Sequence, residues 1–212
     1  MRFFCFHVYI LFLLAGAPCK LSAQNFDINT LKQLNVNRNT NLDPSMQFIS
    51  NSEVYVGIGL PVSVCIASLV KKDRKLFEKG INMSLALVAN TATTFLLKRI
   101  VNRDRPAVTY PYIQAFETHR KYSFPSGHTS NGFCNATTVS LNFQTWYVVI
   151  PAYTWAIAVG YSRMHLGMHY PSDVAAGALL GVGSAWITYK ANKWIRNYYK
   201  QKYTGNKTNE GY

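Results

Sequence analysis

The feature that most constrains the fold is a series of five long apolar runs separated by short basic or polar segments. The runs are Val54–Val70, Ile81–Leu97, a third that starts near the PSGH stretch and fades around Leu141, Trp146–Tyr161 and Val174–Tyr189. Each is slightly shorter than the roughly 20 apolar residues that a helix needs to cross a bilayer. The sequence therefore predicts an all-α fold, a bundle of about five membrane-spanning or buried helices. A soluble core of buried helices is the alternative.

Polar side chains interrupt the second run and limit how it can be placed. They would be costly against lipid but are tolerated where they face the interior of a helix bundle. We therefore expect the interior to receive Asn82, Asn90, Thr91, Thr93 and Thr94.

The placement of charge favours a membrane protein. The net charge is +13, although only 15% of the residues are charged, and the cations cluster between the apolar runs. A nucleic-acid-binding protein would instead spread its basic residues over a polar surface, so we expect no nucleic-acid partner. The positive-inside rule assigns the basic segments 71–75 and 190–202 to the cytoplasm. Threading the runs from an exported N-terminus then brings the ends of runs two and four, and the starts of runs three and five, together on the outer face.

The remaining segments divide the chain as follows. Residues 1–23 combine an early arginine, an apolar stretch and small residues, which predicts a signal peptide cleaved after Ala23 or, alternatively, an uncleaved anchor. Residues 24–50 are predicted to form an exported, loosely ordered or short-helical lead-in. The helical domain is expected over 51–190, and a basic cytoplasmic tail over 191–212.

The cysteines do not indicate a metal or a disulfide framework. Cys65 and Cys134 lie singly in apolar segments, without the spacing of metal ligands. We expect no metal site and no cofactor, and the sequence does not indicate an oligomeric state.

Three polar clusters fall at the ends that the threading brings together. They are Lys98 with Arg105 and Pro106, the turn Pro125–His128, and Arg163 with His169 and Asp173. Arginine binds phosphate oxygens through a planar fork, and lysine acts as a compact charge. Backbone N–H groups at the start of a helix also attract anions. The clusters therefore predict a phosphate-binding site made by Lys98, Arg105, Ser126, Gly127 and Arg163.

The two histidines of these clusters suggest how a bound phosphate ester reacts. His169 and Asp173 are spaced i, i+4, so the carboxylate can accept from one ring nitrogen and leave the other basic. His169 is thus the candidate nucleophile and Asp173 the residue that orients it. His128 is the candidate acid for the leaving oxygen and then the base that activates water. Taken singly, a histidine near a helix end is more often a cap or a surface residue than a catalytic one.

These motifs resemble those of the type 2 phosphatidic acid phosphatase (PAP2) superfamily. The signature K-x6-RP, PSGH and SR-x5-H-x3-D is present without departure, and the resemblance spans roughly residues 81 to 190. It implies a helical-bundle core like that of PAP2 enzymes and haloperoxidases, and metal-independent hydrolysis through a phosphohistidine at His169. The stretch HYPSDVAAGALLGVG is similar to the membrane lipid-phosphatase branch.

The sequence as a whole predicts an integral phosphatase of the inner (cytoplasmic) membrane with its site facing the periplasm or exterior. Its partners would be the bilayer and a lipid phosphate or diphosphate, such as undecaprenyl diphosphate, phosphatidylglycerol phosphate, phosphatidic acid or lipid A. A soluble secreted acid phosphatase of the same superfamily and a headgroup receptor without turnover are the alternatives. A haloperoxidase would hold vanadate with the same cations, but such enzymes are larger and soluble.

Overall fold

The computed structural model describes residues 20–117 and 122–205, and within these ranges it is helical and contains no strand. The elements are α2 (Lys20–Asn35), the 3-10 turn η1 (Thr40–Leu42), α3 (Asp43–Val70), α4 (Arg74–Val101), α5 (Pro106–Thr109), α6 (Gly127–Phe143), α7 (Trp146–His165) and α8 (Pro171–Gly205). The five predicted runs correspond to α3, α4, α6, α7 and α8. The predicted all-α bundle is therefore confirmed. The predicted signal peptide falls mostly on residues 1–19, outside the described ranges.

Local sequence signals explain where the two longest apolar helices meet and end. Asp73 caps α4, because its carboxylate accepts from the backbone N–H groups of Lys75 and Leu76. Asn102 ends α4 in the left-handed conformation, at φ 48°.

Two helices extend beyond the helical domain predicted over 51–190. Helix α3 begins at Asp43, within the predicted lead-in, and α8 continues unbroken to Gly205, within the predicted tail.

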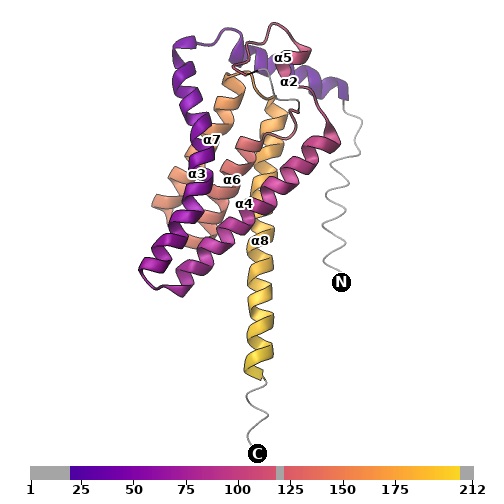
Figure 1. Cartoon of the computed structure of the whole chain (residues 1–212). Helices are drawn as coiled ribbons and strands as arrows, with labels where there is room; N and C mark the ends of the chain where they lie inside the picture. Colours follow the sequence, from indigo (N-terminus) through magenta and orange to yellow (C-terminus); the bar gives the residue numbers. More distant parts are fainter. Residues whose placement is uncertain (1–19, 118–121, 206–212) are drawn as a thin grey trace, which may run out of the picture.

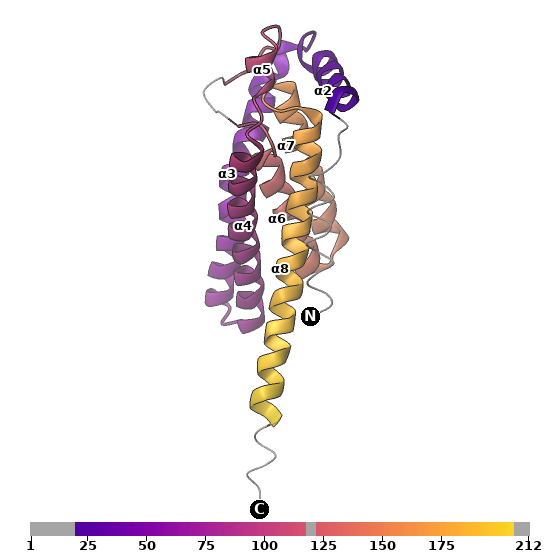
Figure 2. The ribbon, with the colours of Figure 1, turned by 90° about the vertical axis from the view of Figure 1, so that its right-hand side faces the viewer.

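The long helices run roughly alongside one another (Figure 1). In this view α2 and α5 lie across the upper end, and the α3–α4 turn lies at the lower end. Turned by 90°, α8 extends well below the other helices (Figure 2). The turn at residues 71–73 and the basic C-terminal part of α8 thus lie at the same end, as the charge pattern predicts.

The outer surface of the bundle is apolar, as expected for contact with lipid. The helices α3 and α4 are each long and apolar enough to cross a membrane, and only 22% of the most apolar window of α3 is buried. A core helix of a soluble protein would be mostly buried. Large apolar side chains are also exposed on α7 and α8, for example Ile157 at 59% and Leu179 at 70%. This exposed belt disfavours the soluble alternative.

Three of the five polar residues of α4 expected in the interior are buried, and a fourth, Thr93, is half-buried and donates its hydroxyl to the carbonyl oxygen of Ala89 on the same helix. Asn82, Asn90 and Thr94 are buried. Thr91 is exposed, and its hydroxyl lies 3.3 Å from the side-chain oxygen of Asn131 on α6. Hydrogen bonds between helices thus satisfy the groups that would be costly in hydrocarbon.

Two glycines let α8 approach α6 closely. A Cβ added at Gly177 would lie 2.6 Å from the carbonyl oxygen of Ser126, and one at Gly181 would lie 2.2 Å from that of Ser130. Only a residue without a side chain allows backbones to pack at this distance. By contrast, a Cβ at Gly183 would meet nothing within 4 Å, so this glycine serves no such packing. The close approach sets the start of α8 against the PSGH turn.

Candidate active site

The three polar clusters converge at the upper end of the bundle. Arg105, the residue before α5, donates from Nη1 to the carbonyl oxygen of Met168 at 2.9 Å, next to His169. The backbone N–H of Ser126, the cap of α6, donates to the carbonyl oxygen of Asp173 at 3.0 Å. Residues far apart in the sequence are thereby held in one place by hydrogen bonds to backbone carbonyl oxygens.

Lys98 joins this cluster from the last turn of α4. Its Nζ lies 3.3 Å from the carbonyl oxygens of both Tyr122 and Ser123, just before the PSGH turn. Gly127 faces it, since a Cβ added there would lie 3.9 Å from Lys98 Cε. That distance is an ordinary van der Waals contact, so the Lys98 side chain passes directly beside the first residue of α6.

His169 lies in the loop between α7 and α8 and is buried, at 1% exposure. Its Nδ1 is 3.5 Å from Oδ2 of Asp173 and 3.4 Å from the hydroxyl of Ser123. The predicted His169–Asp173 pair is therefore present. With Nδ1 directed at these partners, Nε2 is the nitrogen left for a substrate.

The protonation state of His169 suits a nucleophile. Burial lowers its pKa to about 3, the positive charges of Arg163 and Arg105 act in the same direction, and the hydrogen bond to Asp173 opposes them. The imidazole is consequently neutral at physiological pH, and a neutral ring nitrogen has the lone pair that attack requires.

Asp173 is fully buried in the first turn of α8 and is held on both oxygens. Its Oδ2 accepts from the hydroxyl of Ser123 and from the backbone N–H of Tyr170, at 3.0 Å. Its Oδ1 accepts from Nη1 of Arg103 at 2.8 Å. A carboxylate anchored in this way fixes the orientation of the His169 ring.

The turn before α6 is arranged differently from the sequence-based expectation in one respect. The sequence predicts that Ser126 offers its N–H to an anion, but that N–H donates to the backbone carbonyl oxygen of Asp173. The serine hydroxyl lies 2.8 Å from the hydroxyl of Thr129. Gly127 and His128 form the first turn of α6, where backbone N–H groups have no partner within the helix. His128 is half-buried on the same turn.

Arg163 reaches the site from the last turn of α7 and is 4% exposed. Its Nη1 donates to the hydroxyl of Ser50 on α3 at 2.6 Å. Sequence reasoning missed Ser50, which has no motif and lies in the segment predicted as a lead-in. Only the packing of α3 against α7 reveals this support.

A second contribution that the sequence did not indicate comes from Arg103 and Asp27. Arg103 bonds Asp173 through one nitrogen and Asp27 of α2 through the other, at 2.9 Å, and its guanidinium lies 3.9 Å from the ring centre of Tyr170. Asp27 also accepts from the backbone N–H of Ser172 at 2.9 Å. Although burial lowers the pKa of Arg103, the charges of Asp173 and Asp27 outweigh it and raise the pKa. The helix α2 is thereby tied to the site.

Acidic and histidine side chains do not gather into a metal-binding cluster in the part of the chain that the structure describes. No group of three or more His, Cys, Asp or Glu side chains there is arranged to hold an ion. Cys65 and Cys134 are free thiols on different helices. The cations at this end of the bundle, Lys98, Arg105 and Arg163, suit a phosphate ester.

The fold and the site define a membrane-embedded helical bundle in which cations surround a buried histidine at one end. The chain belongs to the PAP2 superfamily, because the model of that family matches residues 79–197, more than half of its length. The resemblance drawn from the three motifs is thereby confirmed. Asp27 and Ser50 lie outside the matched range.

Individual relatives agree with this membership. The chain is 29% identical to an undecaprenyl-diphosphatase from Sulfolobus acidocaldarius over 194 residues, covering 89% of each protein. It is 33% identical to a lipid A 4'-phosphatase from Bacteroides thetaiotaomicron over 88 residues, which cover 42% of this chain and 39% of that protein. The crystal structure of a transmembrane PAP2 type phosphatidylglycerolphosphate phosphatase from Bacillus subtilis has a TM-score of 0.74 at 24% identity, covering 89% of this chain and 96% of that one. At that identity the likeness concerns the fold.

Proposed function

We propose that this protein is a membrane phosphatase that removes a terminal phosphate from a lipid phosphate or diphosphate. The observation that carries the proposal is the buried, neutral His169, which Asp173 orients while Arg105 and Arg163 lie close enough to lower its pKa. Cations close enough to depress a histidine pKa are well placed to bind the phosphate dianion. The histidine is then held beside its target as a nucleophile.

In the first step, Nε2 of His169 attacks phosphorus and the bond from phosphorus to the leaving oxygen breaks. His128 donates a proton to that oxygen, so the lipid product leaves with a hydroxyl group there rather than as an anion. Lys98, Arg105 and Arg163 stabilise the charge on the transferring phosphoryl group, together with the N–H groups at the start of α6. Nδ1 of His169 keeps its proton and donates it in a hydrogen bond to Asp173, whose negative charge stabilises the positive ring of the phosphohistidine.

In the second step, His128 takes a proton from water, and the resulting hydroxide attacks the phosphohistidine. The bond between Nε2 and phosphorus breaks, inorganic phosphate leaves, and His169 returns to its neutral form. Each proton donated in the first step is recovered in the second. The proposed mechanism needs no metal ion, so activity is expected to survive EDTA.

We place the site on the periplasmic or outer side of the inner membrane. Support comes from the basic segments 71–75 and 190–202, which lie at the opposite end of the bundle from the connection between α7 and α8 that carries His169. Lipid phosphates of the outer leaflet would then reach the cations at the helix ends. The three relatives named above act on different lipids, so the shared core supports the class of substrate rather than one lipid.

The proposal is tested with protein purified in detergent and a panel of undecaprenyl diphosphate, phosphatidylglycerol phosphate, phosphatidic acid and lipid A. Released inorganic phosphate is measured with and without EDTA. Hydrolysis of at least one lipid is expected, with a loss of at least 10³-fold in His169→Ala, the order found when a nucleophile is removed. Turnover at the parental rate by His169→Ala would exclude the phosphohistidine, and binding of the lipids without turnover would favour a receptor.

A further inference from the structure

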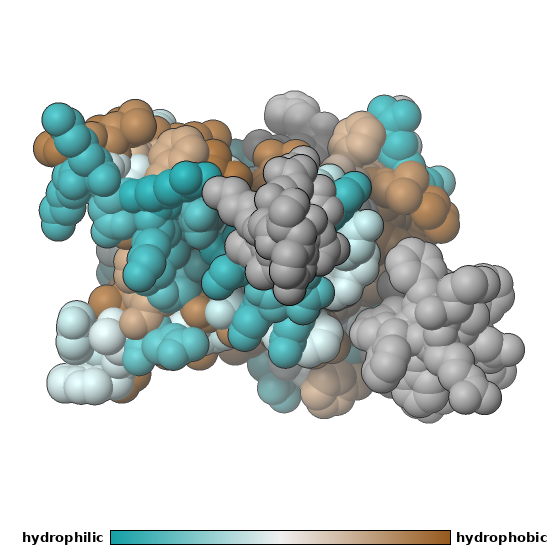
Figure 3. Space-filling view, turned by 90° about the horizontal axis from the view of Figure 1, so that it is seen from below, coloured by the Kyte–Doolittle hydropathy of each residue, from teal (hydrophilic) through white to brown (hydrophobic). Residues whose placement is uncertain are grey.

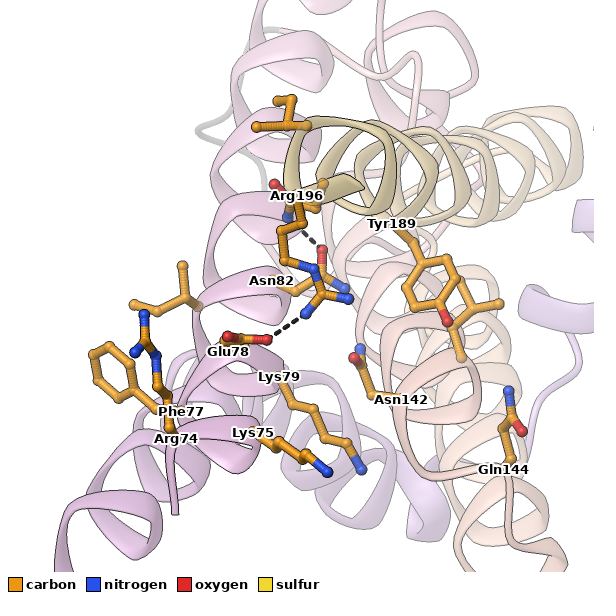
Figure 4. Close-up of a pocket in the computed structure, with 14 residues that line it drawn as sticks. Arg74, Lys75, Phe77, Glu78, Lys79, Asn82, Asn142, Gln144, Tyr189 and Arg196 are labelled. Carbon is orange, nitrogen blue, oxygen red and sulfur yellow. Dashed lines mark hydrogen bonds and ion pairs between the residues drawn. The ribbon is translucent and has the colours of Figure 1, made fainter. Parts of the chain in front are cut away.

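A second cleft lies at the other end of the bundle from the catalytic site, with a volume of about 800 Å³. It is bounded by the first turns of α4, the C-terminal end of α6 and the C-terminal half of α8. Figure 4 shows the side chains of Lys75, Lys79, Asn142 and Arg196 directed into the space between the three helices. Arg74 and Phe77, at the start of α4, are also lining residues of the cleft. No step of the proposed reaction uses this cleft.

The cleft is strongly cationic. Lys75, Lys79 and Arg196 line it, and Glu78, the one acid among its lining residues, is paired with Arg196. Lys79 is held in place, because its Nζ lies 4.7 Å from the centre of the Phe143 ring. Two lysine charges thus remain without a lining carboxylate to neutralise them, which favours an anion.

The remainder of the lining is amphipathic. Its polar part includes a hydrogen bond of 2.6 Å from the side chain of Asn192 to that of buried Asn82. Its apolar part includes Ile81 and Ile195, which are exposed at 40% and 42%. Seen from below, hydrophilic residues cover much of this end of the molecule and hydrophobic residues lie around its margin (Figure 3). A ligand here would meet charge and apolar surface side by side.

We infer that this cleft binds the headgroup of an anionic phospholipid, with the acyl chains along the apolar surface beside it. The cleft lies where the basic start of α4 gives way to its apolar part, which is the depth of a lipid headgroup. Basic pockets between helices on the cytoplasmic side are known to recognise such headgroups. With the orientation proposed above, the lipid comes from the inner leaflet, opposite the leaflet that presents the substrate. The chemistry of recognition does not depend on the catalytic activity.

The experiment compares the parent protein with two matched double substitutions, in detergent for lipid binding and in lipid nanodiscs for thermal unfolding. Binding of phosphatidylglycerol and of phosphatidylcholine to detergent-solubilised protein is measured by native mass spectrometry, and thermal unfolding is followed in nanodiscs of each lipid. The test variant is Lys75→Gln with Lys79→Gln. The control is Lys71→Gln with Lys72→Gln, which removes the same charge from the exposed α3–α4 turn outside the cleft. Unfolding in phosphatidylcholine checks that each variant is folded.

We expect the parent to retain phosphatidylglycerol in preference to phosphatidylcholine. The test variant should lose about fivefold in affinity for each lysine, or about 25-fold for both, and the control should change less than about threefold. Equal losses in the two variants would mean that only the total charge of this end matters, which would overturn the inference. So would equal retention of the two lipids by the parent. Displacement of the lipid by millimolar inorganic phosphate would show that the cleft is a site for the free ion, and this result would also overturn the inference.

Discussion

The guanidinium of Arg103 bonds the carboxylate of Asp173 at 2.8 Å across 70 residues of sequence, and its other nitrogen bonds Asp27 at 2.9 Å. Asp173 in turn faces Nδ1 of His169. A chain of charged groups therefore connects α2 to the proposed nucleophile. Arg103 is a positioning residue in this arrangement, since it acts through Asp173 rather than on the substrate.

Loss of Arg103 is expected to lower kcat about 10- to 100-fold with little change in KM, the range seen when partners of a reactive group are removed. The change Arg103→Gln removes the charge, whereas Arg103→Lys keeps a cation that can reach one carboxylate and should recover part of the rate. Steady-state kinetics on the lipid that the panel identifies provide the measurement. A selective rise in KM would instead place Arg103 on the substrate.

Asp27→Asn tests whether α2 contributes to catalysis. The amide can no longer accept a charged hydrogen bond as strongly from Arg103 or from the N–H of Ser172. We expect a loss of about threefold to tenfold in kcat, smaller than for Arg103→Gln because Arg103 retains its bond to Asp173. Asp104→Asn is the matched control, since Asp104 is an exposed acid beside Arg103. If both changes lower kcat equally, the connection through α2 is not specific.

Asp173→Asn should cause a larger loss, on the order of 10²- to 10⁴-fold in kcat, as in other histidine–carboxylate pairs. The amide still fits the space, but it cannot stabilise the charged ring and can hold His169 in the wrong tautomer. Burst-phase formation of the phosphoenzyme, measured with labelled substrate, should slow by the same factor. An unchanged burst with slow turnover would assign Asp173 to the second step instead.

The depressed pKa of His169 makes a prediction about stability against pH. The folded protein keeps this ring neutral down to a pKa of about 3, whereas the unfolded chain binds a proton near the ordinary value of 6.5. Stability is therefore lost as pH falls below 6.5, by about 2 kcal/mol between pH 6.5 and 5. In His169→Gln, which cannot titrate, the drop in Tm over this range should be smaller. An identical drop in both proteins would show that His169 is protonated normally in the folded state.

The packing of α8 on α6 predicts a contrast among glycines of one helix. Gly181→Ala should destabilise the fold by about 1–3 kcal/mol, because its Cβ would lie 2.2 Å from the carbonyl oxygen of Ser130. The Cβ of Gly183→Ala would meet nothing within 4 Å. Because alanine has a higher helix propensity than glycine, this change should leave the free energy of unfolding unchanged or raise it by up to about 1 kcal/mol. Thermal unfolding in detergent separates the two. Equal effects would mean that α8 does not pack as closely as described.

The helices and the family were accessible from the sequence because they depend on local patterns. Long apolar runs bounded by basic clusters specify helices wherever they occur, and three motifs with fixed spacing identify the superfamily. The convergence of these motifs followed from threading alone, since an alternating path returns every second helix end to the same face. The partners of His169 within its own motif were also predictable, because i, i+4 spacing is a local relationship.

The sequence alone therefore determined the all-α class, the three motifs and the end of the bundle at which they meet. Only the tertiary structure decided that Asp27 and Ser50 support the site, and that the N–H of Ser126 bonds Asp173 rather than remaining open to an anion. These contacts join residues 76, 113 and 47 positions apart, although the last pair belongs to two of the predicted motifs. The reason is physical. A hydrogen bond between distant segments depends on how packed helices are shifted along their axes and rotated about them. Close contacts between helices, such as Gly181 against Ser130, fix both the shift and the rotation.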